Sequence, residues 1–193
     1  MKTLIIGLTG PIASGKNEVA KILEKLRARI IDVDEIGHKV IEPDQPAWEK
    51  LVKHFGIKIL TTNGRVNRVK LSEIVFSNPD ELRMLNHITH PEIFKTVKTE
   101  INRNKLKNLV INAALLKQIG LDKLCDKIIA VIAPKSKRIA RLRKKNLNFE
   151  QIKAIMDAQP KDFEFKKIAD FVINNSGNIK KLNLIVPKIF DLL

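Results

Sequence analysis

One cysteine, one tryptophan and no tyrosine occur among the 193 residues of the chain. The lone cysteine, Cys125, excludes an internal disulfide framework and is typical of a reducing compartment, so we expect a cytoplasmic protein. No apolar run reaches the roughly 18 residues needed to span a bilayer, and we therefore expect no membrane partner. The short apolar stretch at the N-terminus leads into a glycine loop, which predicts a first strand and not a signal peptide.

Acidic residues are also scarce: 21 Asp and Glu accompany 36 Lys and Arg, which gives a formal net charge of +15. Such an excess suggests a polyanionic partner, whether nucleic acid, an anionic membrane or a phosphorylated small molecule. With only eight Phe beside the single Trp, platforms for stacking bases are few, which argues against nucleic acid. Residues 51–150 hold 21 basic and eight acidic residues, so the excess belongs to the middle of the chain. A genomic bias toward lysine is the alternative origin of this charge.

Apolar runs alternate with segments of helical periodicity, which predicts an α/β domain with a parallel sheet. The expected strands span residues 3–8, 29–33, 109–116, 127–133 and 171–173. The mostly helical stretch 35–104 is too long for an ordinary βαβ crossover, so we expect part of it to be a substrate-facing subdomain. Helix starts are predicted at Asn78-Pro79-Asp80 and at residues 89–92, Thr-His-Pro-Glu, which have the form of a capping box.

A glycine loop follows the first expected strand and precedes a helical pattern. Its sequence, Gly10-Pro-Ile-Ala-Ser-Gly-Lys16, matches the phosphate-loop pattern G-x-x-x-x-G-K in the strand–loop–helix context that the motif requires. Glycines let backbone N–H groups turn toward phosphate oxygens, the helix N-terminus adds a favourable dipole, and Lys16 adds a positive charge. The competing interpretation is a chance glycine turn. The predicted nucleotide-binding residues are Gly10, Ala13, Ser14, Gly15, Lys16, Asn17 and Glu18.

Asn17 occupies the position where the phosphate-loop pattern has Ser or Thr, whose hydroxyl binds Mg²⁺. An amide oxygen also ligates hard cations, so Asn17 is the candidate metal ligand, although the substitution weakens that inference. Glu18 favours the helix dipole but is expected close to the phosphates, and the sequence leaves its effect on binding open.

Asp32 and Asp34 stand at the carboxyl end of the second expected strand, where ligands bind in open parallel sheets. Alternation places both side chains on the same side of the sheet if the strand continues that far. A carboxylate there accepts a proton from an attacking hydroxyl or holds the water shell of magnesium. A helix N-cap or a turn explains these aspartates equally well from spacing alone.

Taken in order, the motifs of this chain resemble those of dephospho-coenzyme A kinases nearly from end to end. The phosphate loop alone specifies only a large superfamily, whereas the order and spacing of the other pieces are much more specific. The matching pieces are Gly7-Leu-Thr-Gly10 with Ser14-Gly-Lys16, Ile31-Asp-Val-Asp34, His54-Phe-Gly56, Asn63-Gly-Arg-Val-Asn-Arg68 with Leu71, Leu85-Asn86, His90-Pro91, Ala114-Leu-Leu116, Arg141-Leu142, Gln159, and Ala169-Asp-Phe-Val-Ile-Asn-Asn175 with Gly177.

The resemblance implies an adenylate-kinase-like P-loop fold built on a five-stranded parallel sheet, within a single kinase domain. Its implied parts are a nucleotide-binding core of residues 1–34, 105–134 and 160–193, a helical coenzyme-A-binding region of residues 35–104, and a lid of residues 135–159. It also implies the reaction, which moves the γ-phosphoryl group of ATP, with Mg²⁺, to the ribose 3′-hydroxyl of dephospho-coenzyme A. The residues implied by the family motifs are Asp34, Lys16 and Arg141 for catalysis and Thr9, Asp34, Arg68 and His90 for substrate binding.

This chain departs from the family pattern at three places. Ala114 and Gln118 replace a proline and a glutamate, and the second lid arginine of the family falls near Lys144 or Lys145. Lysine cannot make the forked contact of arginine, so these changes are compatible with a weakened enzyme.

For several basic residues and one histidine, the sequence allows both a functional role and a purely structural one. Residues 135–145 carry seven basic residues, which form either a clamp over ATP phosphates or a solvated face, and Arg141 is the best candidate for the clamp. Arg68 is either a substrate contact or a surface turn residue. His90 either contacts substrate or belongs to a helix start, and the capping-box pattern favours the helix start.

Three functions therefore compete. The leading hypothesis is a dephospho-coenzyme A kinase that acts on a small molecule and binds no nucleic acid. The others are another P-loop kinase for nucleosides or nucleotides, and a catalytically weakened P-loop protein that binds anions through its basic surface.

Overall fold

The computed structural model describes residues 3–104, 108–144 and 147–193. The chain divides into two compact units, the first made of Met1–Asp32 and Arg103–Leu193 and the second of Val33–Asn102. Lys145, one of the two candidates for the second lid arginine, lies outside the described residues.

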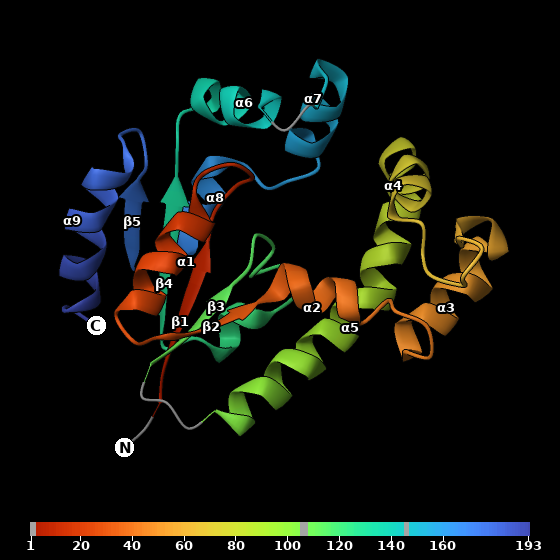
Figure 1. Cartoon of the computed structure of the whole chain (residues 1–193), viewed down its shortest axis with the longest axis horizontal. Helices are drawn as coiled ribbons and strands as arrows, with labels where there is room; N and C mark the ends of the chain where they lie inside the picture. Colours follow the sequence, from red (N-terminus) through yellow and green to blue (C-terminus); the bar gives the residue numbers. More distant parts are fainter. Residues whose placement is uncertain (1–2, 105–107, 145–146) are drawn as a thin grey trace. The chain divides into compact units, whose positions relative to one another are not determined.

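The first unit is built on a parallel sheet of five strands, as the sequence predicts (Figure 1). The strands are β1 (Leu4–Thr9), β2 (Arg29–Asp32), β3 (Asn108–Asn112), β4 (Lys127–Ile132) and β5 (Phe171–Asn174), in the spatial order β2-β3-β1-β4-β5. Parallel strands are covered on both faces, which explains why β1, β3 and β4 read as continuous apolar runs. The expected third strand is shorter than predicted, because after Asn112 the chain leaves the sheet and turns.

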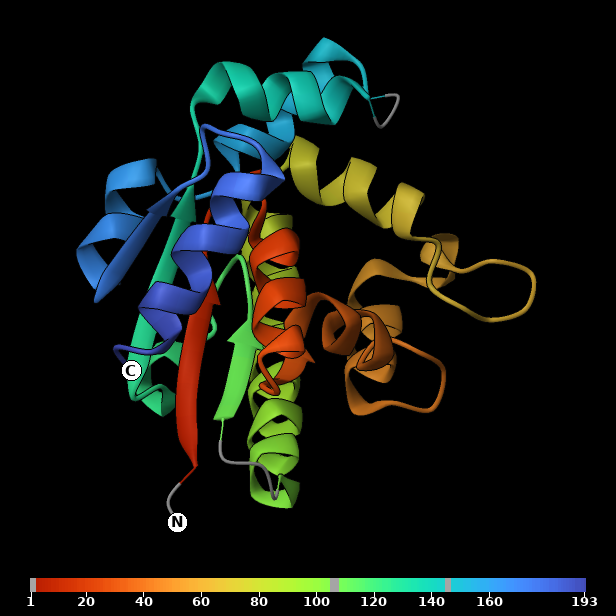
Figure 2. The same cartoon turned by 60° about the vertical axis from the view of Figure 1, so that its left-hand side comes forward.

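Helices of the first unit pack on this sheet and form its core. Figure 2 shows α1 (Lys16–Lys25) and α9 (Ile179–Phe190) side by side in front of the sheet. Val19 and Leu23 of α1 are buried with Val186 of α9 against the strand residues Leu8 and Ile129. The remaining elements are η2 (Leu121–Leu124), α6 (Lys135–Arg143), α7 (Phe149–Asp157) and α8 (Asp162–Ile168). The buried apolar layer fixes α1 on the sheet, so the loop between β1 and α1 starts from two anchored ends.

The second unit is helical. It contains α2 (Val33–Lys39), α3 (Pro46–Phe55), η1 (Ile57–Ile59), α4 (Arg68–Ser77) and α5 (Pro79–Arg103). The helix start predicted at Asn78-Pro79-Asp80 is confirmed, since α5 begins at Pro79 and the Asn78 side chain accepts a hydrogen bond from Asp80 N.

Two further details of the sequence prediction are wrong, one at the boundary between the two units and one within the second unit. The second strand ends at Asp32, and Val33 already belongs to α2, so strand alternation does not apply to Asp34. Residues 89–92 start no helix: they lie inside α5, which continues through Pro91. The Thr89 hydroxyl bonds to the Leu85 carbonyl one turn earlier instead of capping a helix (2.9 Å).

Candidate active site

The loop between β1 and α1 adopts a conformation that depends on glycine at two positions. Gly10 has a φ of 146° and Gly15 a φ of 99°, and Ala13 between them also has a positive φ, 58°. A Cβ atom at Gly10 would lie 2.1 Å from the Val131 carbonyl oxygen, which is backbone and cannot move aside. The glycines of the motif are therefore structural requirements of this loop.

Groups that suit a phosphate gather at this loop. Lys16 opens α1 and is only 8% exposed, although it carries a charge, and the first turn of α1 starts at the adjacent Gly15. Ser14 is 1% exposed, and its Oγ has no hydrogen-bond partner among the described residues. A helix N-terminus, a buried lysine and an unsatisfied buried hydroxyl together offer the positive charge and donors that a phosphate requires.

A pair of asparagines lies at the carboxyl end of the sheet beside the loop. Asn112 ends β3, is 3% exposed, and donates from Nδ2 to Oδ1 of Asn17 on α1 (3.2 Å). The strand register pairs Asn112 with Leu8 of β1 on one side and with Asp32 of β2 on the other. Asn112 Oδ1 is buried without a hydrogen-bond partner in the described part of the chain. Amide and carboxylate oxygens are ligands of hard cations, so this edge of the sheet fits a magnesium ion.

Sequence reasoning missed Asn112. The signal was present, since a polar residue interrupts the apolar run at 109–116, directly where the strand ends. By itself the signal was weak, because asparagine is common wherever a strand gives way to a turn. No group of three or more His, Cys, Asp or Glu side chains that could hold a metal exists among the residues that the structure describes.

Arg141, on α6, contacts the backbone of the phosphate loop. Its Nη1 donates to the carbonyl oxygens of Ala13 (2.8 Å) and Ser14 (3.1 Å), and its Nη2 donates to the carbonyl oxygen of Asn175 (3.3 Å). Arg138, one turn earlier, is 6% exposed and pairs with Asp162 (2.9 Å). Within the basic run, these two arginines therefore have partners inside the first unit. Lys144 is instead exposed at the end of α6.

The other predicted residues of the first unit are less central. Thr9 ends β1, is 1% exposed, and its hydroxyl donates to the Ala114 carbonyl (3.4 Å). Glu18 lies on the exposed face of α1, where its carboxylate pairs with Lys21 (3.2 Å). This pairing gives Glu18 a surface partner and supplies no support for a nucleotide contact.

Three predicted residues lie in the second unit. Asp34 is the second residue of α2 and is exposed, Arg68 is the exposed first residue of α4, and His90 is half-buried in the middle of α5. The start of α4 is fixed locally, because the Asn67 side chain accepts the N–H of Lys70 (3.2 Å) and so caps the helix.

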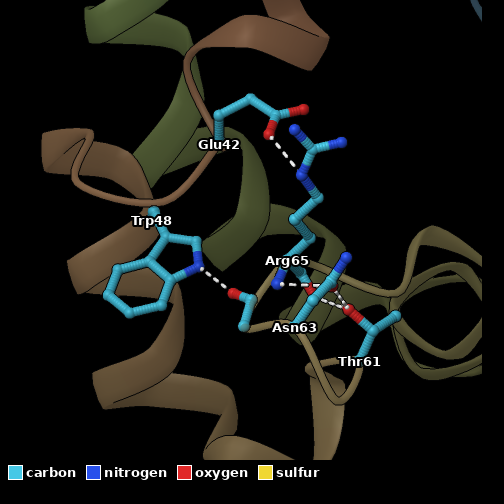
Figure 3. A network of polar contacts seen from close by, with 6 residues as sticks. Glu42, Trp48, Thr61, Asn63 and Arg65 are labelled. Carbon is cyan, nitrogen blue, oxygen red and sulfur yellow. Dashed lines mark hydrogen bonds and ion pairs between the residues drawn. The ribbon is translucent and has the colours of Figure 1, made fainter.

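The segment before Arg68 is a short hairpin with its own polar network (Figure 3). The Trp48 indole N–H donates to the Gly64 carbonyl (3.0 Å), and Arg65 pairs with Glu42 (3.3 Å). The Thr61 hydroxyl donates to the Arg65 carbonyl (2.9 Å). The lone tryptophan thus holds the hairpin that leads to Arg68.

Comparison with known proteins extends these findings. The family model described as dephospho-CoA kinase matches residues 4–181. A dephospho-CoA kinase of Carboxydothermus hydrogenoformans is 39% identical over 91% of this chain and 87% of its own length. One from Bacillus licheniformis is 38% identical over 98% of this chain and 96% of its own length.

Solved structures agree with the sequence relatives. A crystal structure from Thermus thermophilus superposes with a TM-score of 0.83 at 28% identity, covering 100% of this chain and 99% of that one. A dephospho-CoA kinase from Campylobacter jejuni superposes with a TM-score of 0.70 at 28% identity, over 97% and 95% of the two chains. A shikimate kinase from Acinetobacter baumannii shares the fold alone, with a TM-score of 0.53 at 15% identity over 99% of this chain and 93% of that one. The loop that the glycines impose and the match along nearly the whole chain lead to one conclusion: the chain belongs to the dephospho-CoA kinase family.

Proposed function

We propose that this protein transfers the γ-phosphoryl group of ATP to the ribose 3′-hydroxyl of dephospho-coenzyme A. The observation that carries the proposal is the phosphate loop itself, with buried Lys16 and the unsatisfied Ser14 hydroxyl, in a chain of this family. A different nucleoside or nucleotide kinase would share the loop, but its substrate motifs would not follow the family order from end to end.

Phosphoryl transfer depends mostly on positioning and on neutralising charge, because its transition state is loose and spreads charge over the phosphoryl oxygens. In the proposed mechanism Gly10, Ala13, Ser14 and Gly15 supply the loop around the phosphates, and Lys16 neutralises the β and γ groups. Arg141 contributes positive charge from the lid. Its guanidinium has five N–H donors, and the three bonds to loop and strand-end carbonyls use three of them.

Magnesium fits the asparagine pair. Asn17 and Asn112 would hold the ion or its water shell through amide oxygens, and the buried Asn112 Oδ1 has no partner in the described residues. When bound, the ion neutralises phosphate charge and fixes the orientation of the triphosphate. Both asparagines are neutral, so we expect weaker magnesium binding than a site with a carboxylate would give.

Asp34 is the proposed base that takes the proton of the ribose 3′-hydroxyl. Thr9, Arg68 and His90 are the proposed substrate contacts, and Arg68 suits an anionic phosphate of the substrate. We also propose a cytoplasmic enzyme, since the single unpaired cysteine suits a reducing compartment. The described residues include no helix long and apolar enough to cross a membrane.

Replacement of Asp34 tests both the reaction and the role of the carboxylate. In the variant Asp34→Asn we expect kcat for dephospho-coenzyme A to fall by about 10²-fold or more, because general-base catalysis contributes about 10²–10⁴-fold. The Kd for ATP should change less than threefold. Glu35→Gln is the matched control, since Glu35 is the next residue of α2 and its carboxylate forms a surface ion pair with Lys39 (2.7 Å).

The assay uses purified protein, ATP and Mg²⁺ with dephospho-coenzyme A or a panel of nucleosides and nucleotides. Turnover of a nucleotide without turnover of dephospho-coenzyme A would refute the proposed substrate. An equal loss of kcat and ATP affinity in Asp34→Asn would show that Asp34 is structural.

A further inference from the structure

Three side chains from distant parts of the chain hold the backbone of the phosphate loop. Arg141 of α6 donates to the carbonyls of Ala13 and Ser14, as described above. The Asn175 Nδ2 donates to the same Ser14 carbonyl (2.8 Å), and Gln159 Oε1 accepts the N–H of Ile12 (2.7 Å). All of these contacts are made to backbone atoms of the loop, so they do not depend on which residue types the loop contains.

Asn175 occupies the centre of this arrangement. It directly follows β5 and is 5% exposed, and its own N–H donates to the carbonyl of Ile132 at the end of β4 (2.7 Å). Its backbone carbonyl accepts a hydrogen bond from Arg141, so Arg141 contacts both Ser14 and the backbone of the residue that holds Ser14. A Cβ atom at Gly15 would lie 2.1 Å from Asn175 Nδ2, which shows how closely the asparagine approaches the loop. The backbone of Asn175 is therefore anchored in the sheet, and its side-chain amide contacts the loop.

The contact at Ser14 has a direct consequence for the next N–H group. In a trans peptide the C=O of one residue and the N–H of the next point in opposite directions, and no described peptide bond is cis. With the Ser14 carbonyl held by Asn175 and Arg141, the N–H of Gly15 is turned to the side of the loop opposite these two donors. Gly15, with a φ of 99°, has no side chain, so its own sterics restrict this peptide less than those of another residue would.

We propose that Asn175, together with Arg141, is a positioning residue that fixes the Ser14–Gly15 peptide, so that the loop presents the Gly15 N–H to a polyphosphate before the ligand arrives. The inference rests on the proposed function only in taking a nucleotide polyphosphate as the ligand. Donors that are already oriented lose no reorganisation energy when they bind, which is why the arrangement favours tight binding of the developing phosphate charge. Asn175 acts here through the loop and touches no reacting atom.

The test compares Asn175→Leu and Asn175→Asp with the wild-type protein. Leucine removes the donor, and aspartate places an oxygen against the Ser14 carbonyl. Asn174→Asp is the matched control: it adds the same charge one residue earlier, at an exposed position of β5. Kd is measured by calorimetry for ATP and for inorganic tripolyphosphate, and KM is measured for dephospho-coenzyme A. Arg141→Lys is the second variant, because lysine keeps the charge but cannot span two carbonyls.

We expect both Asn175 variants to weaken ATP and tripolyphosphate by the same factor, about tenfold, and to leave KM for dephospho-coenzyme A within twofold. Asn174→Asp should change neither Kd more than twofold, and Arg141→Lys should weaken both polyphosphates in parallel. Loss of ATP binding with unchanged tripolyphosphate binding would overturn the proposal, since it would place Asn175 at the nucleoside. Unchanged affinities in folded variants would overturn it as well.

The tripolyphosphate measurement also separates this inference from the proposed reaction. If the Asn175 variants weaken tripolyphosphate binding but the wild-type protein never phosphorylates dephospho-coenzyme A, the proposed reaction fails and the positioning role stands. If the wild-type protein phosphorylates dephospho-coenzyme A while the Asn175 variants bind tripolyphosphate as tightly as wild type, the proposed reaction stands and the positioning role fails. Should Asn175→Leu not fold, the folded Asn175→Asp and Arg141→Lys proteins decide: the first removes the amide donor to Ser14, and the second keeps Asn175 and the positive charge but loses the forked contact with the loop carbonyls.

Discussion

The replacement Asn17→Ser, which restores the residue type of the common phosphate-loop pattern, should make the protein less stable and yet better at using magnesium. Asn17 Oδ1 is the acceptor for the buried Nδ2 of Asn112, at 3.2 Å. A serine hydroxyl on the shorter side chain cannot occupy that place. Asn112 is 3% exposed, and its Oδ1 is already without a partner in the described residues, so the variant leaves a whole amide unsatisfied.

The structure sets the size of this effect. A buried donor that loses its partner costs about 1–3 kcal/mol in the free energy of unfolding. Asn17 itself is exposed, so water reaches the place of the lost amide and the cost should be near the lower limit, about 1 kcal/mol. For a domain of this size, about 1 kcal/mol lowers Tm by about 2–4 °C.

Calorimetry without nucleotide or metal measures the Tm, and a magnesium titration of kinase activity measures the second effect. A double-mutant cycle with Asn112→Val isolates the pair, because in that background Asn17→Ser removes no hydrogen bond and should leave Tm within 1 °C. At limiting Mg²⁺ the serine variant should keep or exceed wild-type activity, since a hydroxyl is the usual ligand. Two results would refute this reasoning: equal destabilisation in both backgrounds, or loss of activity in Asn17→Ser at saturating Mg²⁺.

Two predictions follow from shifted pKa values. The hydrogen bond from the Ile128 N–H (2.8 Å), aided by Lys127, lowers the pKa of Asp170 below its usual 3.8. This carboxylate therefore stabilises the fold above pH 3.8, and its contribution is lost as the pH falls further. Below about pH 4 the free energy of unfolding, measured by urea denaturation, should fall more steeply for the wild-type protein than for Asp170→Asn. Burial raises the pKa of Cys125 from 9.0 to about 12. Its thiolate fraction at pH 8 is then about a thousandfold smaller, and iodoacetamide should label it rapidly only after unfolding; fast labelling of the folded protein would contradict its burial.

The five strands and the phosphate loop were accessible from sequence because both depend on local patterns: apolar runs for buried strands, and glycines where φ is positive. Strand ends were not. At Asp32 the chain passes directly into α2, although nothing in Ile31-Asp-Val-Asp34 requires a helix at Val33. At Pro91 the opposite error arises, because a proline and a capping-box pattern suggest a break that α5 does not make. Packing of the whole helix outweighs one missing backbone hydrogen bond.

The predicted site residues divide in the same way. Lys16, Gly10 and Gly15 were predicted from the sequence because the chemistry of the loop demands those residue types at fixed spacing. Arg141 was chosen as a clamp on phosphate, but the partners it has in this structure are backbone carbonyls more than 100 positions away in the chain. A carbonyl leaves no trace in a sequence, so neither that contact nor the one from Asn175 could be predicted.

The same contacts change how the charge of +15 is understood. Two of the seven basic residues between positions 135 and 145, Arg138 and Arg141, have their guanidinium groups bonded inside the first unit. Charges held within a few ångströms of a binding loop act in a poorly screened environment, whereas exposed lysines are screened by salt within about 10 Å. Salt should therefore weaken polyphosphate binding far less than the total charge suggests. A steep salt dependence would instead assign the affinity to the surface lysines and would count against both Arg141 and Lys16 as its source.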